Sequence, residues 1–252
     1  TAKFRVLKTA GNQNSQVGVP ITVCGLKKDH TAAVVEMGVS MPGEMARIAA
    51  VVKPTCAVMT NIGVSHIEFM KTRENILKEK AHIADYIPVD GALFVNGDDD
   101  LLPTLKETLG GKVVTFGLGP TCDWRAYGLN EADKGTFFTC LSPAGEKTEV
   151  FVPAAGEHNV RNALAAMAVA RYLGVPAEDA VRAISAYKAP AMRQQVVEAG
   201  GLLIIDDSYN ASPDSMRSAI DVLATRKISG RRAAVLADML ELGDFAQQGH
   251  YE

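Results

Sequence analysis

The sequence predicts an α/β protein: a larger domain with a mostly parallel sheet and a small antiparallel section, then a smaller α/β domain. Two observations carry this prediction. Short apolar runs alternate with segments whose apolar residues recur at helical spacing, which is typical of βαβ units. Between residues 124 and 152 the pattern changes to alternating polar and apolar residues broken by turn residues, which indicates antiparallel hairpins.

Composition narrows the class of protein. A chain of 252 residues with 47% hydrophobic and 22% charged residues is typical of one large or two ordinary globular domains. The net charge of −3, without a basic cluster, argues against a nucleic-acid partner, and no apolar run has the ~20 residues that a membrane helix needs. Four scattered cysteines without a CxxC pair suggest reduced thiols in a cytoplasmic protein. We also expect a monomer, and a fragment of a longer chain.

The first part of the chain alternates predicted strands and helices. Residues 31–36 form a continuous apolar run, which predicts a buried parallel strand. Helical spacing follows Gly43-Glu44 and recurs later in the chain. The remaining predicted elements are strand 56–59, helix 73–86, strand 92–95, helix 101–109, strand 113–116, and hairpin strands 136–141 and 148–152.

The later part continues with two predicted helices and a βαβ unit. One helix follows a glycine loop at residue 156 and the next spans 177–187. Residues 188–193 lose periodicity and indicate a linker, so we place domains at 1–189 and 190–252. The second would contain strand 202–205, helix 213–225 and strand 233–236, and is small enough to suggest truncation.

The stretch 206–213 is the strongest candidate for a site. Asp206, Asp207, Tyr209 and Asn210 follow a predicted strand and precede a helix, where open α/β sheets bind ligands. The alternative is an acidic turn with Ser212 as N-cap and proline at the first helical position.

Two further strand ends carry polar groups. Glu36 follows one strand, and Asn61, His66 and Glu68 follow the next. Oxygen and imidazole ligands without thiolates suit a hard cation such as Mg²⁺, although each residue alone is more often structural. The run at 96–100 is either a turn with a helix cap, which we favour, or part of a ligand site.

Two helices carry candidate residues. Lys80 lies on a stripe of isoleucines, where a lysine with its ammonium group in water is the simpler explanation. Asn159 and Asn162 share one face of a first helical turn after a glycine loop, a geometry that can bind an anion or a polar base. The alternative is that Asn159 is only the N-cap.

These motifs together resemble the Mur ligase family of peptidoglycan synthesis, nearly from end to end. The resemblance implies a P-loop-NTPase-like central domain followed by a Rossmann-like domain. It rests on residues 9–14 with 18–20, 36–38 with 43–44, 60–63 with His66 and Glu68, Lys80, 156–159 with Asn162, Arg193, 206–213 and 238–243. The last two point to the branch that adds D-alanyl-D-alanine to UDP-N-acetylmuramoyl-tripeptide.

The resemblance also implies residue roles. Glu36 and His66 would each hold one of two Mg²⁺ ions, and Lys80 would be carbamylated as a further ligand. Arg193 would reach the ATP γ-phosphate. Asn159 and Asn162 would contact the adenine. Asp207 would contact the ribose, with Tyr209 and Asn210 flanking the nucleotide. A loop with Thr9, Asn12 and Asn14 would face the UDP-linked substrate.

The implied reaction is ADP-forming amide ligation through an acyl phosphate. Smaller departures from the family pattern occur at Ser15, at Ala81-His82 and at Ala237, and none removes a proposed ligand. The chain contains no G-x-x-x-x-G-K-[ST] phosphate loop, so we expect these 252 residues alone not to turn over ATP. Alternatives are a sister Mur or folylpolyglutamate-type ligase, or a non-catalytic nucleotide-binding module. A Rossmann dehydrogenase has little support, since no strand is followed by G-x-G-x-x-G.

Overall fold

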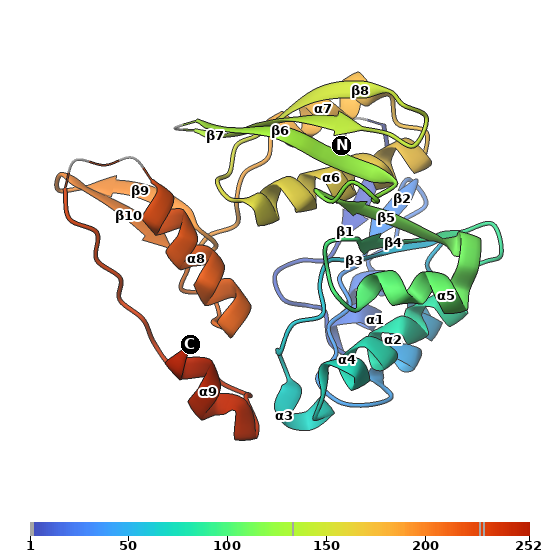
Figure 1. The fold of residues 1–252 in the computed structure, drawn as a ribbon. Helices are drawn as coiled ribbons and strands as arrows, with labels where there is room; N and C mark the ends of the chain where they lie inside the picture. Colours follow the sequence, from blue (N-terminus) through green and yellow to red (C-terminus); the bar gives the residue numbers. More distant parts are fainter. Residues whose placement is uncertain (1–2, 133, 227, 229) are drawn as a thin grey trace.

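A computed structural model describes residues 3–132, 134–226, 228 and 230–252 (Figure 1). Asp133, part of a predicted hairpin turn, lies outside the described residues. The strands are β1 (Val6–Lys8), β2 (Ala32–Val34), β3 (Cys56–Met59), β4 (Ala92–Asn96), β5 (Val113–Gly117), β6 (Trp124–Ala132), β7 (Gly135–Leu141), β8 (Lys147–Val152), β9 (Gln195–Ala199) and β10 (Leu202–Asp206).

The structure contains each predicted helix, and it adds α1 and α3 in stretches where the sequence predicted loops. They are α1 (Gly18–Cys24), α2 (Glu44–Val52), α3 (Ile67–Met70), α4 (Arg73–Ala81), α5 (Leu105–Leu109), α6 (Glu157–Tyr172), α7 (Ala177–Ser185), α8 (Pro213–Thr225) and α9 (Ala246–Tyr251). Short 3₁₀ segments are η1 (His82–Tyr86), η2 (Leu102–Thr104), η3 (Gly110–Lys112) and η4 (Gly243–Phe245). The predicted helix 73–86 is therefore an α-helix that tightens into a 3₁₀ turn. None of the described helices is long and apolar enough to cross a membrane.

A six-stranded sheet in the order β3-β4-β5-β6-β7-β8 organises most of the chain. Strands β3 to β6 pair in parallel, whereas β6, β7 and β8 pair antiparallel. This confirms the predicted α/β class with a mostly parallel sheet and a small antiparallel section.

Helices cover both faces of this sheet, and β4 shows how the two cores are divided. Leu93 and Val95 join a core with α2, α4 and η1, whereas Ala92 and Phe94 face a second core under α6 and α7. Alternate residues of a strand point to opposite faces, so a strand buried on both sides is continuously apolar, as the sequence of β4 is. Figure 1 shows α6 and α7 on one side and α2, α4 and α5 on the other.

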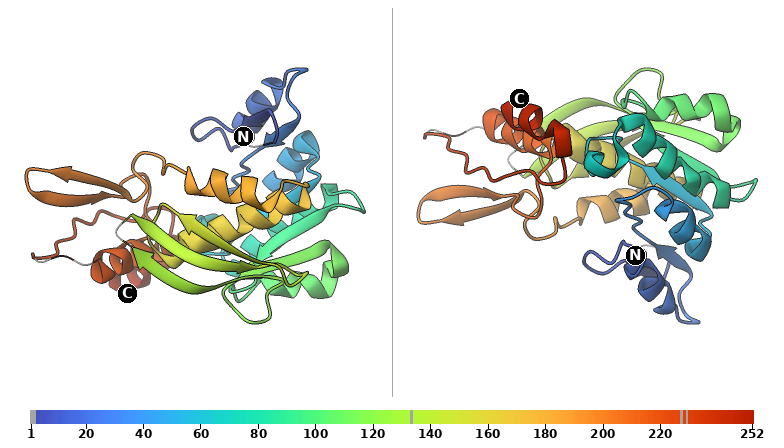
Figure 2. Two further views of the ribbon diagram at one scale, coloured as in Figure 1. Left: turned by 90° about the horizontal axis from the view of Figure 1, so that it is seen from above. Right: turned by 90° about the horizontal axis from the view of Figure 1, so that it is seen from below.

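The predicted buried strand at residues 31–36 is only partly correct. Residues 32–34 form β2 and pair in parallel with β1, but Val34 is 64% exposed. In the described part of the chain β2 has β1 as its sole strand partner, and the two form a sheet of their own. Figure 2 shows this N-terminal segment, in dark blue, protruding beside the main body. An apolar run shows that a strand can be buried, but burial needs neighbours on both faces.

The C-terminal part consists of a hairpin, one long helix and an extended segment. Strands β9 and β10 are antiparallel and joined by Gly200 and Gly201, both at positive φ, as a two-residue hairpin turn requires. The helix α8 begins where predicted: Ser212 is the N-cap, its side chain accepting from the Ser215 amide, and Pro213 takes the first position. The capping interpretation of Ser212 is thus confirmed.

The predicted strand at residues 233–236 is wrong for this structure. Residues 231–240 form neither helix nor strand, and Val235 is fully exposed. A strand exists only with a hydrogen-bonding neighbour, and the described neighbour of β10 is β9. The apolar residues of this segment favour a β-strand, but no strand in the described chain pairs with it.

Helix α2 is anchored by a buried glutamate from another helix. Glu79 of α4 is 7% exposed, and its two carboxyl oxygens accept hydrogen bonds from the backbone amides of Gly43 and Met45, each at 2.8 Å. The first amides of a helix have no partner within the helix, and Gly43, at φ 83°, has no side chain to cap them. Glu79 therefore supplies this cap across the core.

We predict that Glu79→Ala lowers the free energy of unfolding by about 2–4 kcal/mol, because two buried amides lose a carboxylate partner. Chemical denaturation followed by circular dichroism measures this loss. The matched control is Glu74→Ala, at an exposed position of the same helix. Equal denaturation midpoints for the two variants would show that the Glu79 cap is dispensable.

Candidate functional site

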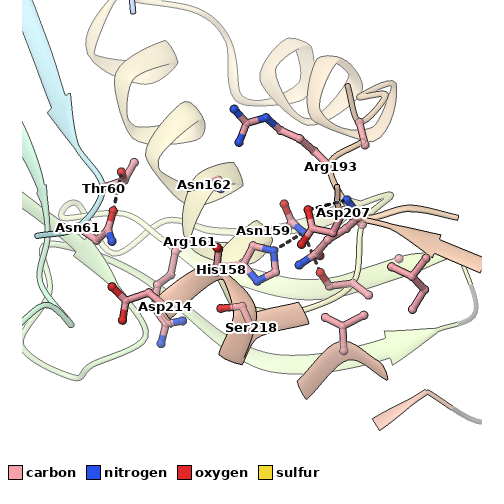
Figure 3. Close-up of a pocket in the computed structure, with 18 of the residues that line it drawn as sticks. Thr60, Asn61, His158, Asn159, Arg161, Asn162, Arg193, Asp207, Asp214 and Ser218 are labelled. Atoms are coloured by element: carbon pink, nitrogen blue, oxygen red, sulfur yellow. Dashed lines mark hydrogen bonds between the residues drawn. The ribbon is translucent and has the colours of Figure 1, made fainter. Parts of the chain in front are cut away.

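A cavity of about 1250 Å³ lies where the main body meets the C-terminal part (Figure 3). Its walls come from the ends of β3 and β4, the first turn of α6, the linker before β9, and α8. Among the predicted site residues, Asn159, Asn162, Arg193 and Asp207 line it. Residues from three segments distant in sequence thus converge on one cavity of a size that accommodates a nucleotide.

The first turn of α6 presents two amides to this cavity. Gly156, at φ 89°, is the N-cap of α6 and Asn159 lies inside the helix, so the simpler interpretation of Asn159 as the cap is wrong. The Asn159 amide nitrogen instead contacts the Ala155 carbonyl oxygen at 2.8 Å and His158 Nε2 at 2.9 Å. The amide is consequently held in one orientation.

A partly exposed ion pair braces the same turn from the sheet side. Asp98, whose side chain is 16% exposed, accepts from Arg161 Nε at 2.7 Å and from the backbone amides of Leu118 and Gly119 at 2.8 Å. Burial by itself raises the pKa of Asp98, but these hydrogen bonds and the Arg161 charge together hold that pKa below its usual value. The brace therefore joins β4, the end of β5 and α6 through one carboxylate.

The linker brings the predicted C-terminal residues to the cavity. The Arg193 guanidinium lies over the Tyr209 ring, 4.2 Å from its centroid, and the backbone amide of Gln194 donates to Asp207 Oδ1 at 3.1 Å. Tyr209 and Asn210 themselves are not among the residues lining the cavity. Asn210 instead accepts, through its side-chain oxygen, from the Ala211 amide at 2.9 Å.

The predicted substrate loop and the predicted metal ligand Glu36 form a second cluster. Asn14 donates to Glu36 Oε1 at 2.9 Å, and the Thr9 hydroxyl accepts from the Glu36 backbone amide at 2.8 Å. Asn12 is exposed, and its carbonyl oxygen accepts from the Asn14 amide at 2.8 Å. The structure thus joins residues that the sequence assigned to two different roles.

Lys80 is a largely buried cation on α4 that interacts electrostatically with Asp99. Burial lowers the pKa of its ammonium group, and the charge of Asp99 opposes that shift. Asp99 lines the cavity and accepts from the backbone amides of Leu101 and Leu102, as the predicted helix cap, and also from the Ile62 amide. The favoured interpretation of the run at 96–100, a turn with a helix cap, is therefore confirmed by Asp99, and its part in a ligand site stays a prediction.

His66 contacts the C-terminal segment. Its Nδ1 pairs with the Glu241 carboxylate, and the Glu68 amide donates to the Glu241 carbonyl oxygen at 3.3 Å. His66, Glu36 and Lys80 are not among the residues that line the cavity. In the described ranges no group of three or more His, Cys, Asp and Glu side chains is placed to hold a metal ion.

Sequence reasoning missed the contributions of Asp98, Arg161 and His158. Asp98 lies in an acidic run that was interpreted mainly as a turn and cap, and Arg161 lies between the two predicted asparagines. Their positions in the sequence were the available signal. Asp98 follows the carboxyl end of a predicted strand, and His158 and Arg161 follow a glycine loop.

Known proteins place this geometry in context. The Mur ligase middle domain family matches residues 1–170, and the family described as Mur ligase, glutamate ligase domain matches residues 192–252. A Bacillus subtilis UDP-N-acetylmuramoyl-tripeptide--D-alanyl-D-alanine ligase is 38% identical over 99% of the chain and 54% of its own length.

Solved structures agree. A crystal structure of MurF from Acinetobacter baumannii matches with a TM-score of 0.93 and 34% identity, over 99% of this chain and 54% of that one. MurF ligase from Thermotoga maritima in complex with ADP matches with a TM-score of 0.87 and 28% identity, over 98% of this chain and 57% of that one. The chain thus spans about half the length of the relatives it matches.

We predict that Asp98→Asn destabilises the protein by about 1–3 kcal/mol at neutral pH, because one charged acceptor of the brace is lost. Because the folded-state pKa of Asp98 is lowered, its contribution is present above the unfolded-state pKa of about 3.9 and disappears as pH falls through the folded value. Denaturation curves at neutral and at acidic pH measure the difference, with exposed Asp221→Asn as control. A difference that persists unchanged in acid would contradict the role of the Asp98 charge.

Proposed function

The chain belongs to the Mur ligase family, and from this premise we propose that it carries the nucleotide-binding part of an ATP-dependent amide ligase of peptidoglycan precursor synthesis. The observation that carries the proposal is the convergence of Asn159, Asn162, Arg193 and Asp207 on one cavity. A similar solved structure is a complex with ADP, which supports a nucleotide as the occupant.

The whole protein would add D-alanyl-D-alanine to UDP-N-acetylmuramoyl-tripeptide. The names of the relatives that match nearly the entire chain support this substrate pair. We also keep the division into domains 1–189 and 190–252 as part of the proposal. The two family matches, which end at residue 170 and begin at residue 192, support it.

Each cavity residue has a role that its chemistry suits. The Asn159 and Asn162 amides would contact adenine, and the Asp207 carboxylate would accept from a ribose hydroxyl. Arg193 would leave the Tyr209 ring and reach the γ-phosphate, since a guanidinium binds phosphate oxygens through paired hydrogen bonds. Tyr209 and Asn210 would flank the nucleotide once the two parts of the chain close on it.

The donor set also suits Mg²⁺. Glu36 supplies carboxylate oxygens, and Asn14 already orients them. The contact between His66 Nδ1 and Glu241 leaves Nε2 as the ligating nitrogen, because ligating histidines commonly donate their other ring N–H to a carboxylate. One Mg²⁺ held by Glu36 and a second held by His66 and a carbamylated Lys80 would neutralise charge between the substrate carboxylate and the triphosphate.

Burial prepares Lys80 for carbamylation. A lowered pKa increases the fraction of neutral amine, whose lone pair attacks CO₂ to form an N–C bond while one N–H proton leaves to solvent. The product is an anionic group with two oxygens. This group would turn a cation that cannot ligate a metal into a ligand of the kind that Mg²⁺ prefers.

The reaction then follows in two steps. The tripeptide carboxylate attacks the γ-phosphorus, the bond to the bridging oxygen breaks, and ADP leaves with an acyl phosphate formed. The amine of D-alanyl-D-alanine attacks the acyl carbon, loses a proton and expels phosphate. Residues of this chain contribute positioning and charge neutralisation, which supply most of the catalysis in phosphoryl transfer.

We predict that the whole protein sustains multiple-turnover ADP release only when UDP-N-acetylmuramoyl-tripeptide and D-alanyl-D-alanine are both present. Asp207→Asn should lower kcat/KM for ATP by about tenfold or more, because a charged contact to the nucleotide is lost. A coupled ADP-release assay measures both, with the neighbouring Asp206→Asn as control. Equal turnover with single amino acids, or no turnover with the dipeptide, would refute the proposed substrate.

We predict that ¹³C-labelled bicarbonate produces a carbamate signal that depends on Lys80. Lys80→Arg should abolish the signal because a guanidinium does not add CO₂, whereas Lys78→Arg, at an exposed position of α4, should leave it intact. Carbon-13 NMR of the protein at neutral to alkaline pH detects the adduct without reference to activity. A signal unchanged in the Lys80 variant would place the carbamate elsewhere.

A further inference from the structure

A second cavity adjoins the first, on the side of the loop that follows β3. Its volume is about 360 Å³, at the lower end of the range for small-molecule sites. Three residues line both cavities, namely Asn61, Asp99 and Asp214. The second cavity also has apolar walls, from Ile62, Val64, Pro213 and Phe245. A nucleotide in the first cavity does not account for this second space.

The boundary between the two cavities is built against Gly63. A Cβ atom at this position would collide with Asp214 Oδ2 and would lie 3.2 Å from Asn61 Nδ2. Figure 3 shows Asn61 and Asp214 near each other at one side of the first cavity. Because residue 63 has no side chain, the first turn of α8 can bring a carboxylate to the junction of the two cavities.

Two charged groups of the second cavity are occupied in holding its walls. Arg73 donates through Nε to the Ile62 carbonyl oxygen at 2.8 Å, and its other nitrogens donate to both carboxyl oxygens of Asp100. Asp99 accepts from three backbone amides at 2.8 or 2.9 Å. These side chains therefore fix the loop after β3 and the end of β4 in place.

Asp214 and Arg217 of α8, in contrast, are accessible to a ligand. Arg217 lies 3.6 Å from a carboxyl oxygen of Asp214 and 3.6 Å from one of Glu252, and both distances exceed the range of a hydrogen bond. The side chains of Arg217 and Asp214 are 58% and 46% exposed. An ion pair this long and this exposed contributes little to stability, so a ligand can replace it at low cost.

The spacing of the two groups suits a molecule with an ammonium group at one end and a carboxylate at the other. Residues three apart on a helix have Cβ atoms ~5–6 Å apart, and the charged ends of an extended dipeptide are at most ~7 Å apart. Asp214 lines both cavities, whereas Arg217 is among the residues that line the second. The ammonium end would therefore face the nucleotide cavity, and the carboxylate end would lie farther from it.

We propose that the second cavity binds the amine substrate, a zwitterionic dipeptide with small side chains, with its carboxylate on Arg217 and its ammonium group on Asp214. The inference rests on the proposed function, in which the acceptor is D-alanyl-D-alanine, as the name of a relative supports. The reacting nitrogen would then lie at the junction with the cavity in which the acyl phosphate forms. A guanidinium binds a carboxylate through paired hydrogen bonds, so the site selects a free carboxyl terminus.

The test compares D-alanyl-D-alanine with D-alanyl-D-alaninamide, which has a neutral amide in place of the carboxylate, as acceptors in steady-state ADP release by the whole protein. We expect wild type to favour the acid in kcat/KM by about tenfold or more, because the amide leaves the guanidinium without a charged partner. Arg217→Gln should bring this ratio close to one by weakening the acid alone. Arg217→Lys, which keeps the charge without the paired geometry, should retain part of the preference.

Asp214→Asn tests the other end of the dipeptide. We expect this variant to lower kcat/KM for acid and amide by the same factor, since both carry the ammonium group, and to keep the wild-type ratio between them. The matched control is Arg182→Gln in α7, where Arg182 and Asp179 form an exposed pair with the same spacing. Arg182 is not among the residues that line either cavity, so this variant should behave as wild type.

The outcomes separate this inference from the function on which it rests. Turnover with equal kcat/KM for acid and amide in wild type would overturn the acceptor site and leave the ligase function standing, and this comparison needs no variant to fold. An acid-to-amide ratio that Arg217→Gln leaves unchanged would also overturn it, because a purely structural role weakens both acceptors equally. Absence of turnover with the dipeptide would refute the proposed function itself.

Discussion

The fixed position of the first turn of α6 is the constraint on which the candidate site depends. This turn is short of local hydrogen-bond partners, as every helix start is, and here it is held from outside. The Asp98 carboxylate binds Arg161 from the sheet side, and Gly156 allows His158 to reach Asn159 from the cavity side. These contacts act on one helical turn, so Asn159 and Asn162 face in the same direction. Helix propensity alone would not fix that direction.

The opposite wall of the cavity has a different character. Met192 and Gln194 both adopt positive φ, at 60° and 49°, and flank Arg193 in a linker with little regular structure. Two hydrogen bonds donated by backbone amides, from Gln194 to the Asp207 carboxylate and from Tyr209 to the Met192 carbonyl, tie this linker to the segment just after β10. The braced first turn of α6 thus faces a linker whose position depends on a few backbone angles. This arrangement is suited to closing on a ligand.

Sequence reasoning succeeded where the determining interactions are local. The N-cap at Ser212 and the alternation in β7 and β8 each depend on residues a few positions apart. It failed where the outcome depends on a distant partner: Val34 is exposed because β2 lacks a second neighbour in the described chain, and residues 233–236 do not pair at all. The Asp98 brace spans 63 residues and the His66 contact with Glu241 spans 175, so no local pattern could have predicted either.

The contact between His66 and Glu241 links the two halves of the proposed chemistry. If His66 ligates Mg²⁺ through Nε2, the carboxylate that orients its ring comes from the segment that follows the unpaired residues 231–240. A carboxylate that accepts from Nδ1 fixes the tautomer and increases the basicity of the ligating nitrogen. The ring would then be prepared for the metal only while the C-terminal segment is docked on α3, where Gly243 packs against Glu68. If His66 is a ligand, metal affinity and the placement of the C-terminal part would therefore be coupled through a single side chain, and a motion that separates His66 from Glu241 would change both.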